Sequence, residues 1–405
     1  RWAPETRSAR PELGDPGNPA GPDIHAAGVP CAGRLAWDVA RHAVRRAQPI
    51  LPLGAGIPGW LVAMGGDNWN QPAADTAGSI AAVALETVAA ICDTPELAAP
   101  GIPTPQPGDT IQGLVNSVAN AMGVPPPTVN VANGERLVRE VQREIVTAKS
   151  GRRDALWALR RALGQARELV YVESPMFART ARPGATPAAH EIDLVEVLRA
   201  QMAANPRLKI VICVPRLPDF APDKGPWLRA ALQHRKEAVE TLTSQDRNRV
   251  AAFHPIGFPG RHAVIRSTVV IVDDVFCLTG TSHFRRRGMT FDGALDIAAI
   301  DRTLAEGYSA AIRTFRQQLM AAKLGVEAPT APAGASALWV RLARPESAFD
   351  AVADLLAQGG LGRCSPVWAG PTDTNVIPQT ADVADPDGAN GAQFLTLFAS
   401  LLSEA

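Results

Sequence analysis

The side chains that could do chemistry are concentrated in residues 265–301, IRSTVVIVDDVFCLTGTSHFRRRGMTFDGALDIAAID. Two apolar runs flank the Asp273 and Asp274 pair, and a turn of small residues precedes three consecutive arginines. Guanidinium groups bind phosphate oxygens through paired hydrogen bonds, and hydroxyl groups supply further donors. The stretch is therefore a candidate phosphate site carried by a strand hairpin.

The elements that must position this hairpin alternate between short apolar runs and longer amphipathic segments. This alternation predicts an α/β layered fold, with a mixed β-sheet flanked by helices. The predicted strands are residues 168–177, 207–220, 249–258, 263–274 and 275–282. The predicted helices are residues 33–47, 79–94, 134–167 (with a break near Ser150 and Gly151), 190–206, 225–245, 302–325, 347–358 and 393–405.

This order of elements resembles the phospholipase D superfamily over roughly residues 150–325, where the YVES, KIVICVP and VAAFHPIG strands precede the hairpin. The resemblance implies two HxKxxxxD motifs, one in each half of the protein. It implies that one histidine attacks phosphorus and the other protonates the leaving group, while the lysines hold the phosphoryl oxygens.

The second of these motifs falls on Arg266, Thr268 and Asp273, so only the aspartate is kept. Arginine remains protonated and offers no lone pair for attack on phosphorus, although it binds phosphate well. We therefore expect this half to bind a phosphodiester without cleaving it, with Asp273 available to pair with Arg266.

The other family positions fall on small, charged and aromatic residues around the hairpin. Asp296 stands where glutamate is usual, and His283 stands where asparagine is usual. His283 is either a substitute nucleophile or acid, or a turn residue. The arginine triplet is either phosphate-facing or solvated, and Glu173 is either a pocket residue or part of a structural ion pair. The candidate substrate-binding residues are Gly280, Thr281, Ser282, Arg287, Asp296, Tyr171 and Glu173.

The chain divides into four predicted parts. Residues 1–48 are a possible remnant of the first phospholipase D-like half, because residues 23–47 loosely resemble the segment after the first motif in bacterial members. Residues 49–133 form an Ala/Gly/Pro-rich region of helices and loops, residues 134–325 the phospholipase D-like domain, and residues 326–405 a tail with helices. His25 and His42 are expected to be surface or capping residues. An intact HxKxxxxD upstream of residue 1 would favour an enzyme.

Composition narrows the partners. The chain has 40 basic and 40 acidic side chains, and this neutral balance argues against broad nucleic-acid affinity. The five cysteines show no metal-ligand spacing, so we predict no metal and no cofactor. Widely spaced thiols, with no signal peptide and no apolar run of bilayer length, predict a cytoplasmic protein. No oligomeric state is predicted.

Two functions remain open. The first is a phospholipase D-like phosphodiester hydrolase whose second motif is degraded, so that this chain is inactive alone or only binds a phosphodiester. The second is a non-catalytic scaffold that binds a phosphodiester or a phospholipid head group. A nuclease-like member is a third and looser reading.

Overall fold

The computed structural model describes residues 2–4, 23–47, 80–88, 112–113, 116, 151–181, 191–218, 225–257, 262–290, 292–301 and 303–367. The predicted helices at 134–150 and 393–405 lie outside these residues, as does most of region 49–133.

A mixed nine-stranded sheet forms the centre of the described part, in the order β12-β7-β6-β5-β9-β10-β11-β3-β4. β5, β6 and β7 run parallel, and every other neighbouring pair in this sheet is antiparallel. The strands are β3 (Ile80–Val88), β4 (Arg152–Arg153), β5 (Leu169–Glu173), β6 (Lys209–Cys213), β7 (Val250–Pro255), β9 (Thr268–Val272), β10 (Phe276–Gly280), β11 (Ala294–Asp301) and β12 (Cys364–Pro366).

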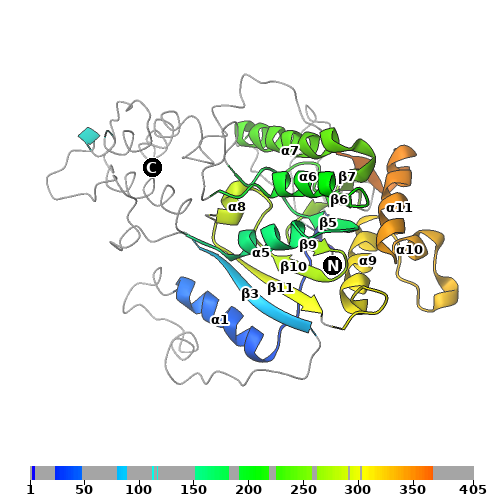
Figure 1. The fold of residues 1–405 in the computed structure, drawn as a ribbon, viewed down its shortest axis with the longest axis horizontal. Helices are drawn as coiled ribbons and strands as arrows, with labels where there is room; N and C mark the ends of the chain where they lie inside the picture. Colours follow the sequence, from blue (N-terminus) through cyan, green and yellow to red (C-terminus); the bar gives the residue numbers. More distant parts are fainter. Residues whose placement is uncertain are drawn as a thin grey trace.

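Helices cover both faces of this sheet (Figure 1). They are α1 (Gly33–Ala47), α5 (Asp154–Leu163), α6 (Leu194–Ala204), α7 (Gly225–Gln245), α8 (Arg286–Thr290), α9 (Ala310–Lys323), α10 (Ala337–Arg341) and α11 (Pro345–Ala357), with short 3-10 turns at Arg247–Arg249, Pro332–Gly334 and Gly359–Gly362. The predicted α/β class with a mixed, helix-flanked sheet is confirmed.

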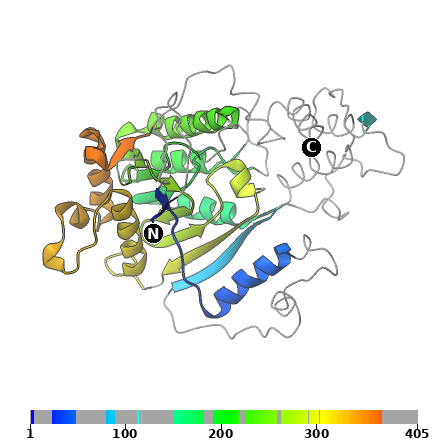
Figure 2. The same cartoon turned by 180° about the vertical axis from the view of Figure 1, so that it is seen from behind.

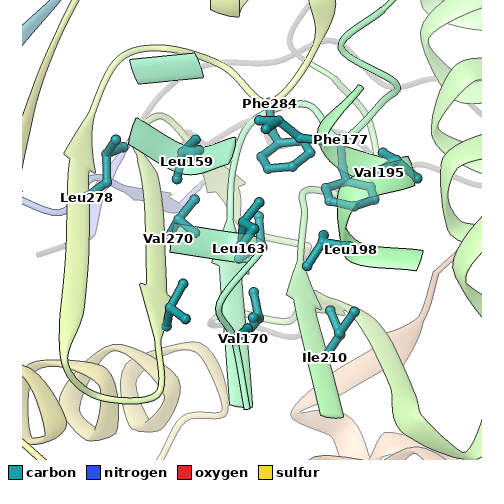
Figure 3. Packing of buried hydrophobic residues seen from close by; sticks show 14 of the residues in the cluster. Leu159, Leu163, Val170, Phe177, Val195, Leu198, Ile210, Val270, Leu278 and Phe284 are labelled. Carbon is teal, nitrogen blue, oxygen red and sulfur yellow. The ribbon is translucent and has the colours of Figure 1, made fainter. Parts of the chain in front are cut away.

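Side chains along the central strands point alternately to the two faces of the sheet and form a hydrophobic core on each. Val170 and Val172 face the side covered by α5, α6 and α7, whereas Leu169 and Tyr171 face α9, α10 and α11. Successive strand residues point to opposite faces, so a run that is apolar throughout needs a helical layer on each side. Figure 3 shows the first core, where Phe177 and Phe284 stack with their ring centroids 4.8 Å apart.

A second, three-stranded sheet joins the start of the chain to the hairpin. β2 (Asp23–His25) pairs with β1 (Trp2–Pro4) and runs parallel to β8 (Val264–Ile265), just before β9. The early segment lies beside the main sheet when the molecule is seen from behind (Figure 2). His25 thereby lies next to the motif, although the two are far apart in the sequence.

The predicted helix at residues 79–94 is wrong, because residues 80–88 form β3 and pair along their length with β11. Small apolar residues carry no clear period, so their pattern does not separate a buried helix from a strand. Pairing with the long β11 then decides the outcome, since strand formation depends on cross-strand neighbours.

The other predicted elements within the described residues form at the expected places, with shifted ends. The closing helix begins at Ala310 rather than at residue 302, where the Ser309 hydroxyl accepts the Ile312 N–H at 3.2 Å. The sheet also takes strands from outside predicted domain 134–325, namely β3 and β12. The tail therefore supplies an edge strand as well as helices.

Candidate functional site

The candidate site lies at one end of the central strands. β5 ends there at Glu173, the antiparallel β9 begins there at Thr268, and β10 ends there at Gly280. The sheet register thus brings together Tyr171, Glu173, Thr268 and the turn at 280–283.

Thr268 is fully buried, and its hydroxyl is already hydrogen-bonded. The Thr268 Oγ1 and Ser174 Oγ atoms are 3.0 Å apart, and Ser174 Oγ also accepts the Phe284 N–H at 3.0 Å. Ser174 N–H in turn donates to the Cys213 carbonyl at 3.2 Å. At the position where a phosphate-binding lysine is expected, the chain therefore has a hydroxyl bonded to Ser174, the residue that links the ends of β5, β6 and β9.

Arg266 precedes this strand in the link from β8 and is exposed. Its backbone N–H donates to the His25 carbonyl at 3.0 Å, and the neighbouring Ser267 hydroxyl accepts the Ala27 N–H at 2.8 Å. The early segment of the chain therefore fixes the backbone that carries the guanidinium group.

The glycine turn is built around the Asp296 carboxylate. Ser282 donates to Asp296 twice, from its N–H at 3.0 Å and from its hydroxyl at 2.5 Å, and the Thr87 hydroxyl lies 3.1 Å from the Ser282 hydroxyl. A side chain at Gly280 would overlap Asp296 and the Leu295 carbonyl, so only glycine fits. Burial raises the pKa of Asp296 even though the Ser282 bonds oppose the shift. Asp296 is therefore a buried support of the turn.

His283 follows Ser282 and precedes the buried Phe284, so both neighbours fix its backbone. Burial lowers the pKa of His283 to about 4, and the Arg285 and Arg266 guanidinium groups lower it further while Asp292 opposes them. The imidazole is therefore neutral near pH 7. It has a lone pair to offer but no proton to give a leaving group.

The arginine triplet is engaged in ion pairs. Arg285 and Arg287 both contact Asp292, at 2.8 and 3.0 Å, and Arg286 pairs with Glu191 at 3.1 Å. These contacts order the segment after the turn.

Asp273 lies at the opposite end of β9 from Arg266. Its carboxylate accepts three backbone N–H groups, those of Arg167, Glu168 and Leu169, at 2.8, 2.8 and 3.0 Å. The expected pairing with Arg266 is wrong, because the five residues of β9 separate the two side chains. The kept motif aspartate closes the turn before β5 instead.

Glu173 lies within a buried charge cluster. Its carboxylate is 2.8 Å from Lys323 Nζ, 3.3 Å from His25 Nδ1 and 3.0 Å from the Tyr171 hydroxyl, and Lys323 also contacts His25. Burial opposes ionisation of Glu173, but Lys323 and His25 outweigh it and lower its pKa to about 2. Burial also lowers the pKa of His25.

Two of these cluster residues were missed from sequence. His25 was expected at the surface but is 3 % exposed, and Lys323 resembled an ordinary basic residue in the last turn of a helix. His42 is also buried and lies 2.9 Å from Glu86. One feature of the sequence pointed to His25. It lies in the segment that loosely resembles the family, and that segment forms the short strand β2.

Within the described residues, no group of three His, Cys, Asp or Glu side chains is placed to hold a metal ion. Over the same residues, every helix is too short or too polar to cross a bilayer.

No family model and no curated protein sequence matches this chain. Among solved structures it is similar to Nuc from Salmonella typhimurium, described as a phospholipase D family member, with 13 % identity and a TM-score of 0.28 over 41 % of this chain and 84 % of Nuc.

Two further structures are NucT from Helicobacter pylori and phosphatidylserine synthase from Haemophilus influenzae Rd KW20. NucT has 15 % identity and a TM-score of 0.25 over 37 % of this chain and 79 % of its own. The synthase has 12 % identity and a TM-score of 0.31, and the match covers 53 % of this chain and 44 % of the synthase.

Proposed function

We propose that this chain is a phospholipase D-like protein that binds a phosphodiester at the Arg266 end of the sheet without cleaving it. One observation carries the proposal. The position of the attacking histidine holds an exposed arginine, and the position of the lysine holds Thr268, whose buried hydroxyl is bonded to Ser174. The supporting turn of Gly280, Ser282 and Asp296 is nevertheless intact.

The chemistry of the site favours binding over hydrolysis. Arg266 stays charged at any ordinary pH and presents paired donors to phosphate oxygens. Nucleophilic catalysis also needs a proton donor for the leaving alcohol. His283, with its pKa lowered to about 4, does not supply that proton near pH 7.

The test combines turnover and equilibrium binding of bis(4-nitrophenyl) phosphate. We expect no release of nitrophenol and measurable binding that Arg266→Ala weakens by roughly tenfold or more, because a charge-assisted contact is lost. Arg266→Lys should restore part of the affinity. Arg199→Ala is the matched control, because Arg199 is a surface arginine on α6 that pairs with Glu196 at 2.6 Å.

A hydrolase that uses His283 as the nucleophile is the second candidate, favoured by the neutral imidazole near Arg266. It predicts turnover that His283→Ala abolishes and that Arg199→Ala leaves intact. That result would replace the binding proposal. Unchanged phosphodiester binding in Arg266→Ala would also reject the binding proposal, since the binding site would then lie elsewhere.

A further inference from the structure

A groove of about 1290 Å³ lies at the other end of the sheet from Arg266, around the turn that joins β9 to β10. This volume is somewhat larger than the roughly 300–1,000 Å³ of typical small-molecule sites, so the groove has room for a small ligand. β3 and β11 form its floor, α5 and the end of α6 form one wall, and the loop around Tyr308 closes the side. Of the motif positions only Asp273 lines it, and that carboxylate lies away from the Arg266 end of β9.

The floor of the groove is apolar and open to solvent. Val83 is 53 % exposed, Ile300 48 % and Leu304 47 %, and the small side chains of Ala158 and Ala298 lie beside them. Covering such surface releases water and is favourable, and contiguous exposed apolar surface marks binding sites more often than chance. An alkyl chain fits this floor, which lacks aromatic stacking partners apart from Phe276 and Tyr308.

The rim of the groove carries three arginines and three carboxylates, and among the described residues only the arginine side chains lack partners. Within the part of the chain that the structure describes, the guanidinium groups of Arg161, Arg167 and Arg207 make no ion pair and no hydrogen bond. The groove carboxylates do have partners. Glu168 accepts the Tyr308 hydroxyl at 2.5 Å, Glu306 lies 3.7 Å from Arg344, and Asp273 accepts three backbone N–H groups.

Two of these arginines are held on adjoining loops. The Asn205 side chain donates to the Arg167 carbonyl at 2.8 Å and accepts the Arg207 N–H at 3.3 Å. Gln201 donates to the Ala166 carbonyl at 2.6 Å and anchors the same loop to α6. Arginine donors match phosphate and carboxylate oxygens in geometry as well as charge.

We propose that this groove binds a single-chain amphipathic anion, with its alkyl chain on β3 and β11 and its phosphate or carboxylate head at the arginine rim. The apolar floor and the uncommitted arginines lie at the same site, so both ends of one molecule are bound at once. Neither a free inorganic anion nor a neutral detergent makes both sets of contacts.

The experiment is calorimetric titration of the full chain with dodecyl phosphate, kept below its micelle concentration. We expect one site, and roughly tenfold or greater loss of affinity in Arg167→Gln/Arg207→Gln, because the head loses its charged donors. Arg313→Gln is the charge-matched control on α9. Val83→Asn should weaken binding several-fold, and Val340→Asn, on an equally exposed valine of α10, should not.

Ligand controls separate the two ends of the molecule. Inorganic phosphate and dodecyl maltoside should each bind more weakly than dodecyl phosphate, and dodecanoate shows whether a carboxylate head is accepted as well as phosphate. Equal affinity of dodecyl phosphate for the wild type and the double arginine variant would overturn the proposal. So would inorganic phosphate binding as tightly as the alkyl ligand, or a loss in Val340→Asn equal to that in Val83→Asn. Thermal melts of each variant exclude loss of folding.

Discussion

The Glu173 carboxylate, the Lys323 ammonium and the His25 ring make one buried unit, although His25 and Lys323 are 298 residues apart along the chain. Removing one charge of a buried pair leaves the other uncompensated in a medium of low dielectric constant. We expect Lys323→Met to lower the free energy of unfolding by about 3–5 kcal/mol. Adding Glu173→Gln should recover part of this loss, because the stranded charge is then removed.

Urea titrations check this expectation against Lys236→Met. Lys236 lies 3.9 Å from Glu240 on the surface of α7, with side chains 31 % and 63 % exposed, so its removal should cost less than about 1 kcal/mol. Equal effects of the two lysine substitutions would show that the buried unit adds no stability.

The same unit sets a pH dependence with a definite sign. Folded Glu173 has a pKa of about 2, below its ordinary 4.5, so the unfolded chain takes up a proton first as pH falls. The stability from Glu173 is therefore present above pH 4.5 and lost between there and about 2. The pKa of His25 is also lowered from 6.5, so its contribution is lost as pH falls below 6.5. In Lys323→Met, less stability should be lost between pH 4.5 and about 2, because Glu173 no longer has its ammonium partner.

The motif positions could be proposed from the sequence because the spacing from Arg266 to Asp296 is local. The companions of Glu173 could not be. His25 is 148 residues away from it along the chain, and only the pairing of β2 with β8 brings them together. Asp273 has a similar lesson, since the sequence offered Arg266 as its partner, whereas the fold gives its carboxylate three backbone N–H groups.

At the scale of elements, α11 shows how closely the predicted tail is joined to the domain. Phe349, Val352 and Leu355 on this helix belong to the same core as Leu169 and Val211 on the central strands. Phe349 is 3 % exposed, so Phe349→Ala should lower the free energy of unfolding by about 3–5 kcal/mol through the cavity it leaves.

Val340→Ala on α10, where the valine is 58 % exposed, is the control and should change stability by less than about 0.5 kcal/mol. Thermal and urea unfolding should each show one transition in both variants. A separate early transition in Phe349→Ala, with the main midpoint unchanged, would show that the tail is an independent unit.

The elements that could be predicted are those with a strong period or a central place in the sheet, such as β5, β6, β9 and α7. β3 was mistaken for a helix because its alanines fit either structure, and long-range pairing with β11 decided between them. The tail was not expected to enter the sheet for the same reason, since β12 has three residues and gains its partner only in the folded chain.

At the scale of the whole molecule, the sheet has two chemically different ends. One end carries Arg266, His283 and the glycine turn, and the other carries the apolar groove with its arginine rim. β9 runs between them with five buried residues, a span of roughly 16 Å. The buried strand presents no polar side chain between the two ends apart from Thr268 at its start.

This separation makes the two proposed sites energetically independent. Effects of substitutions more than about 10 Å apart add within roughly 0.5 kcal/mol when they share no partner. We expect Arg266→Ala to weaken phosphodiester binding by the same factor in the wild type and in Arg167→Gln/Arg207→Gln, and to leave dodecyl phosphate affinity unchanged in both. A double-mutant cycle of both affinities measures this. A coupling above about 1 kcal/mol would instead show that β9 transmits occupancy of one end to the other, because rigid, close-packed strands carry displacement along their length.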